Sequence, residues 1–64
     1  EGMDRDERAR LAEAVRRECL RALLEAHERA GFAGLCAEGR FELAVDAVRS
    51  LSLEALVADG DDGA

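Results

Sequence analysis

Apolar side chains recur every three or four residues through the first half of the chain, and charged residues fill the positions between them. One row of these apolar residues consists of Leu11, Val15, Cys19, Ala22, Leu23, Ala26 and Ala30. A second row beside it consists of Ala12, Leu20, Leu24 and His27. This spacing matches the turn of an α-helix, so the pattern predicts one long amphipathic helix over about residues 5–30.

Both ends of this predicted helix carry capping signals. Asp4 followed three residues later by Glu7 is typical of a capping box, in which each side chain accepts a hydrogen bond from the other residue's backbone amide. Gly31 stands where a left-handed cap residue belongs, and Phe32 can fold back over the last turn as the apolar contact of that cap. We therefore expect a glycine-rich corner over residues 31–38.

The second half of the chain predicts two shorter helices. The apolar residues of the first one are Phe41, Leu43, Ala44, Val45, Ala47, Val48 and Leu51. Together they cover more than half of the circumference of a helix over about residues 39–50, which indicates that it is covered from two directions. Ser52 resembles the N-cap of a third helix over about residues 53–58.

These elements define one helical domain with two short ends. We assign residues 4–58 to the domain and expect the acidic, glycine-rich residues 59–64 to form a disordered tail. Met3 followed by Asp4 is typical of a natural start. We therefore interpret Glu1 and Gly2 as residues left by an expression vector and Met3 as the start of the natural chain.

The predicted long helix exceeds the size of a 64-residue globule. At the helical rise per residue the predicted helix spans about 39 Å. A compact chain of this length has a radius of gyration of about 11 Å, which corresponds to a diameter of roughly 28 Å. We therefore predict an all-α fold in which a helical hairpin assembles into an oligomeric bundle, either a homodimer or a tetramer. The predicted interface consists of Leu11, Val15, Leu20, Leu24, Phe41, Val45 and Val48.

The net charge narrows the choice of partners. The formal net charge is −6, and the basic residues, all arginines, are interleaved with carboxylates in the first half of the chain. Such a surface is poor at neutralising phosphate groups, so neither nucleic acid nor an anionic membrane is an expected partner. No apolar run reaches the length of about 18 residues that a membrane span needs, and no secretory signal is visible, so we expect a cytoplasmic protein.

The sequence offers no pattern typical of an enzyme. It holds no phosphate-binding glycine loop and no Ser-His-Asp arrangement, and no cofactor or metal is predicted. We expect a noncatalytic, self-associating interaction or regulatory module that binds a protein partner through apolar helix faces.

The alternative function is a thiol or metal sensor centred on Cys36. The corner can bring Cys36 near His27, and Glu38 and Glu42 could add carboxylate ligands. Cys19 lies on the apolar row of the long helix, where a free cysteine is expected to pack as a small buried hydrophobe.

Three acidic residues share one face of the predicted helix over residues 39–50. Glu38, Glu42 and Asp46 recur every four residues, and like charges placed in this way are mildly destabilising. The sequence leaves open whether they form a solvated face, hold a divalent cation or meet arginines of the long helix in a partner chain. Those arginines are Arg16, Arg17 and Arg21.

Overall fold

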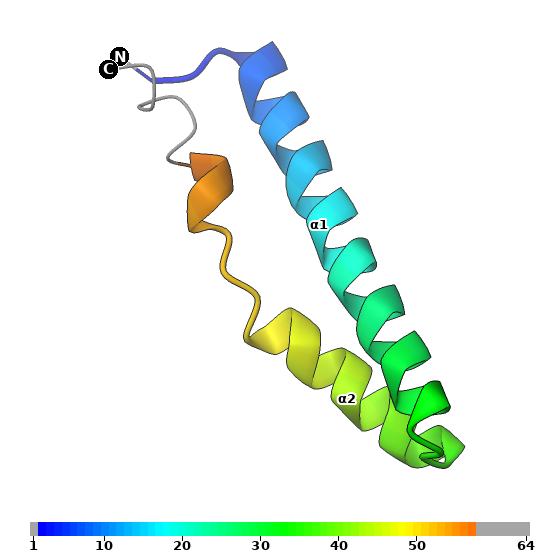
Figure 1. Cartoon of the computed structure of the whole chain (residues 1–64). Helices are drawn as coiled ribbons and strands as arrows, with labels where there is room; N and C mark the ends of the chain where they lie inside the picture. The colour runs from blue at the N-terminus through cyan, green and yellow to red at the C-terminus, as the bar shows by residue number, and fades with distance from the viewer. Residues whose placement is uncertain (1, 58–64) are drawn as a thin grey trace.

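The computed structural model describes residues 2–57, and this part of the chain contains helices and no strand. Helix α1 spans Arg5–Phe32 and helix α2 spans Ala37–Arg49. Helix α2 runs back alongside the C-terminal half of α1, and the chain then continues in the direction of the start of α1 (Figure 1). The prediction of an all-helical chain is confirmed.

The start of α1 is fixed by the predicted capping box. The Asp4 carboxylate accepts a hydrogen bond from the Glu7 amide at 2.8 Å, and the Glu7 carboxylate accepts one from the Asp4 amide at 3.1 Å. Arg8 adds a hydrogen bond from its guanidinium to the carbonyl of Met3 at 2.9 Å. Free amides at the helix start are thereby satisfied by side chains that the sequence places at the right spacing.

The end of α1 differs from the prediction. Gly31 lies inside the helix, and the residue with a left-handed backbone is Gly34, with φ of 84°. The Leu35 amide donates to the Ala30 carbonyl and the Gly34 amide donates to the Gly31 carbonyl, both at 3.0 Å, which is the pattern of a Schellman cap. The prediction that Gly31 ends the helix is therefore wrong, because Gly34 supplies the left-handed turn three residues later.

The apolar residue next to this cap is Leu35 and not Phe32. Phe32 is 84% exposed, whereas Leu35 is half-buried and lies against the first turn of α2. A Cβ atom built on Gly39 would stand 3.2 Å from the Leu35 side chain, so a glycine at this position allows the close contact.

Arg40 connects the two helices across this corner. Its Nε donates a hydrogen bond to the Leu35 carbonyl at 2.9 Å, and its guanidinium lies 3.5 Å from the position that a Cβ atom of Gly31 would occupy. The side chain thus satisfies a carbonyl that the turn leaves free and covers the last turn of α1.

The two shorter predicted helices also change. Helix α2 begins at Ala37 instead of residue 39, with Cys36 as an N-cap in extended conformation whose carbonyl accepts from the Arg40 amide at 2.9 Å. The predicted third helix is a single helical turn over residues 54–57, in which the Leu56 amide donates to the Leu53 carbonyl at 3.0 Å. Its last predicted residue, 58, the predicted tail over residues 59–64 and Glu1 lie outside the described residues.

Within residues 2–57, the buried side chains are all alanines. Three of them, Ala22, Ala26 and Ala30, recur every four residues along α1, and the fourth, Ala44, comes from α2. Fully burying one Leu, Val or Phe contributes about 1.5–3 kcal/mol, so this chain buries little of its capacity for hydrophobic stabilisation.

The molecule is a thin layer. Its principal extents are 48 × 23 × 14 Å, and its radius of gyration is 15.2 Å, against about 11 Å for a compact chain of this length. A helix with its side chains is roughly 10–12 Å across, so the smallest extent corresponds to one layer of helices. Helical domains normally bury their apolar faces against a second layer, which this chain lacks within residues 2–57.

The two glycines of the corner should respond in opposite ways to alanine. Gly31→Ala should raise the free energy of unfolding by roughly 0.5–1 kcal/mol, because glycine is unfavourable inside a helix and the new methyl group meets Arg40 at ordinary contact distance. Gly34→Ala should lower it by about 1–2 kcal/mol, because an L-residue is strained in the left-handed region. Urea unfolding of the parent chain and both variants, followed by circular dichroism at the same protein concentration, measures both changes. A loss of stability in Gly31→Ala with none in Gly34→Ala would contradict this account of the corner.

Candidate functional site

Large apolar side chains stand exposed on both helices. Leu20 and Leu24, one turn apart on α1, are 51% and 61% exposed, and Phe41 and Leu43 on α2 are 66% and 44% exposed. Isolated exposed apolar residues are common on proteins, but several of them on two adjacent helices are typical of an interaction surface.

One side of the α1–α2 contact forms a groove with an aliphatic lining, which we call the apolar groove. It has a volume of about 350 Å³ and is lined by Leu23, Val45, Val48 and Arg49. Leu20 lies three residues before Leu23 and Phe41 lies four residues before Val45, so each exposed side chain shares a helix face with a residue that lines the groove.

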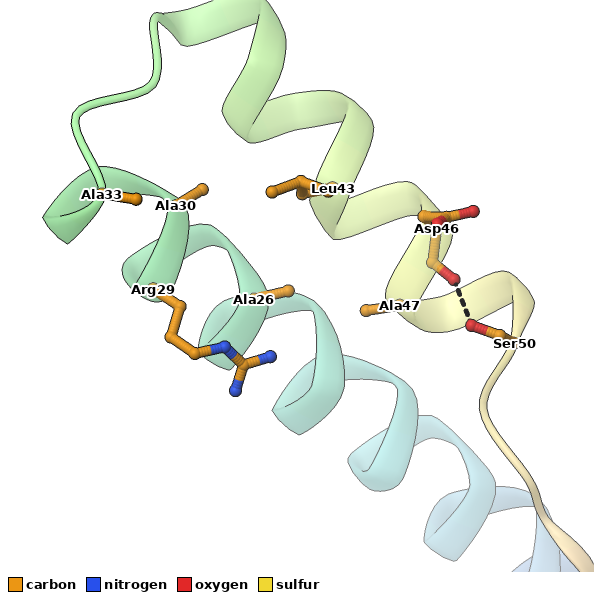
Figure 2. Close-up of a pocket in the computed structure, with 8 residues that line it drawn as sticks. All are labelled: Ala26, Arg29, Ala30, Ala33, Leu43, Asp46, Ala47 and Ser50. Atoms are coloured by element: carbon orange, nitrogen blue, oxygen red, sulfur yellow. Dashed lines mark hydrogen bonds between the residues drawn. The ribbon is translucent and has the colours of Figure 1, made fainter.

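The other side of the contact forms a second groove, which we call the alanine groove (Figure 2). Its lining residues are Ala26, Arg29, Ala30, Ala33, Leu43, Asp46, Ala47 and Ser50. Leu43 and Ala47 point from α2 toward the alanines of α1, and polar side chains of both helices stand at the rim (Figure 2). The Ser50 hydroxyl donates a hydrogen bond to the Asp46 carbonyl at 2.7 Å.

The predicted interface residues fall into two groups by exposure. Leu20, Leu24 and Phe41 are exposed, whereas Leu11, Val15, Val45 and Val48 are half-buried by their own chain. The structure places Val45 and Val48 together in the apolar groove, and their role in an interface stays a prediction.

The interface predicted from sequence omits two residues of the apolar groove, Leu23 and Arg49. Leu23 belongs by spacing to the same apolar row of α1 as Ala26 and Ala30, but its angular position lies at the edge of that row toward Leu20. An edge position of this kind is the only sequence signal that could have identified it.

Most arginines of the predicted basic patch form ion pairs along α1 itself. Arg16 pairs with Glu13 at 3.2 Å. Arg21 pairs with both Glu18 and Glu25 at 3.1 Å, and the hydrogen bond that it donates to the Glu18 carboxylate is the main cause that raises the pKa of Arg21. These exposed pairs contribute little to stability, but they occupy side chains that were candidates for a partner's carboxylates.

The acidic face of α2 stands in solvent. Glu38, Glu42 and Asp46 are all exposed, and none of them forms an ion pair within residues 2–57. Within residues 2–57, no group of three or more His, Cys, Asp or Glu side chains is arranged so that it could hold a metal ion.

Cys36 is exposed at the N-terminus of α2. Its Sγ makes no capping hydrogen bond, yet the backbone amides of Gly39 and Glu38 lower the pKa of the thiol, because amides at a helix start favour the thiolate. Arg40 adds a smaller contribution in the same direction. His27 is also exposed, and Cys19 is half-buried on α1 and less enclosed than a core position requires.

Comparisons with known proteins give this chain no relative, since no family model, curated protein or solved structure matches it. Among the described residues, no helix is both long enough and apolar enough to cross a membrane.

The Cys36 thiol should ionise at a lower pH in the folded chain than in the unfolded chain. In a Cys19→Ala variant, where Cys36 is the single thiol, the rate of alkylation by iodoacetamide should reach half its maximum at a lower pH in buffer than in concentrated guanidinium chloride. Equal midpoints in the two solvents would show that the amides of α2 do not stabilise the thiolate.

Proposed function

We propose that the protein is a noncatalytic, self-associating helical module that acts by helix-to-helix contact, with its own copies and through them with a larger partner. The observation that carries this proposal is the contrast between a core of four alanines and the exposure of Leu20, Leu24 and Phe41. Large apolar side chains contribute most when they are buried, and this chain alone leaves them in water.

The thin shape of the molecule supports the same proposal. A single layer of two helices has two open faces, and a second copy supplies the missing layer with no further sequence. We infer a hairpin of α1 and α2 as the unit of assembly and a bundle of two or four such hairpins as the product.

Native mass is the direct test. Sedimentation equilibrium of the purified chain should give a dimer or a tetramer, and the mass should not respond to zinc or to a chelator. A monomer over the whole accessible concentration range would contradict self-association. A mass that follows the metal would favour the sensor function instead.

The runner-up function is a thiol sensor at Cys36. Its support is the position of an exposed sulfur at a helix N-terminus beside the amides of Glu38 and Gly39. Hydrogen peroxide would be the oxidant: the thiolate sulfur attacks one peroxide oxygen, the O–O bond breaks, hydroxide leaves, and sulfur is oxidised to the sulfenic acid. The metal-binding version of this function has no ligand cluster within residues 2–57.

Mass spectrometry after mild peroxide treatment separates the two functions. A sensor requires that peroxide add one oxygen atom at Cys36 and that this addition be absent in the Cys36→Ser variant. It also requires that the native mass of the protein change on oxidation. Oxidation that leaves the native mass unchanged would support the interaction module and contradict a sensor that works through assembly.

A further inference from the structure

We propose that the apolar groove, with Leu20 and Phe41 at its edges, is the face by which a second copy of the chain docks about a twofold axis. The inference rests on the self-association proposed above and assigns it to one of the two open sides of the α1–α2 contact. The occupant is the same face of a second copy, because a twofold interface brings one patch against itself.

The lining of the two grooves decides between the two sides. The apolar groove is built from Leu23, Val45 and Val48, and its one charged residue, Arg49, has a long aliphatic stem. The alanine groove carries Arg29, Asp46 and Ser50 at its rim, so a partner there would have to remove water from charged groups (Figure 2).

The two grooves lie on opposite sides of the contact between the helices. Ala44, the buried residue of α2, marks the direction of α1, and its two neighbours in sequence project about 100° to either side of it. Val45 on one side lines the apolar groove, and Leu43 on the other lines the alanine groove. One substitution on each side therefore tests the two grooves separately.

The face formed by the apolar groove with Leu20 and Phe41 combines projecting and recessed side chains, as a self-complementary contact requires. Leu20 and Phe41 are more than half exposed, whereas Leu23, Val45 and Val48, which line the groove, are half-buried. A second copy turned by a twofold rotation offers the same projections and the same recess, so each copy can place side chains into the groove of the other.

The exposed area fits a second copy of this size. The chain exposes 5205 Å², whereas a compact monomer of 6.9 kDa exposes roughly 4000 Å². The excess of roughly 1200 Å² is larger than the area of about 800 Å² that each partner buries in a standard interface. The chain therefore exposes enough surplus area to supply its share of one standard interface with a second copy.

The charge of the chain adds an observable property. Two copies that each carry −6 repel one another, and no carboxylate lines the apolar groove itself, although Glu42 and Asp46 line the neighbouring hollow around Phe41. Salt screens this repulsion and leaves apolar contact intact, so the dimer should tighten as salt rises. Pairing of the acidic face of α2 with arginines of α1 in the partner would weaken under the same change.

The test compares two matched substitutions by sedimentation equilibrium of the purified protein. Leu20→Glu changes the apolar face and Leu43→Glu changes the alanine groove, at leucines of similar exposure on the two helices. Circular dichroism should show both variants as helical as the parent, because neither leucine is buried. Leu20→Glu should raise the dissociation constant by at least about 100-fold, because it brings carboxylates into an apolar interface, and Leu43→Glu should change it by less than about 3-fold. Phe41→Glu should repeat the result of Leu20→Glu from the other helix.

The outcomes separate this inference from the proposed function. A parent chain that stays monomeric would overturn self-association altogether. A dimer that resists Leu20→Glu and Phe41→Glu but dissociates with Leu43→Glu would overturn only the choice of groove. A dimer that weakens between about 0.05 M and about 0.5 M salt would show that charge pairing, and not the apolar groove, holds the copies together.

Discussion

The close contact of α1 and α2 through alanines is the constraint on which the rest of the structure depends. Ala22, Ala26 and Ala30 form a row on α1 against which α2 places Ala44. Small side chains let two helix backbones approach closely, and at that distance a large side chain cannot stand between them. Leucines and valines of both helices are therefore displaced to the two sides of the contact, where they line grooves or remain in water.

The corner maintains this contact at one end. Gly34 turns the chain, Leu35 packs against the first turn of α2, and Arg40 satisfies the Leu35 carbonyl while covering Gly31. Each of these interactions is local, so the pairing of the helices near the corner needs little loop-closure entropy. Farther from the corner the two helices diverge (Figure 1).

Sequence periodicity and capping chemistry account for most of the fold. The capping box at Asp4 and the apolar rows of α1 were sufficient to predict where α1 begins and which of its faces is charged. They could not choose between Gly31 and Gly34, because each is a glycine followed by an apolar residue. The start of α2 was missed for a related reason: Cys36 is not a preferred N-cap residue, so no signal marked it.

The grooves are harder to predict than the helices, because they depend on the direction in which α2 crosses α1. Periodicity gives the face of each helix that is apolar, but it does not state which edge of that face the neighbouring helix leaves uncovered. Leu23 illustrates this, since by spacing it belongs to the same apolar row as the buried Ala26 and yet lines an open groove. The sequence therefore predicted apolar faces on both helices without locating the groove beside their contact.

The corner and the apolar groove are far enough apart to act separately. Cys36 stands at the first turn of α2, and Val45 follows nine residues later, which corresponds to about 13 Å along the helix axis. Oxidation of the Cys36 sulfur would add a small polar group at the exposed end of α2 without entering the groove. Redox control of assembly would thus have to act through the corner, by changing the start of α2 and with it the crossing of the two helices.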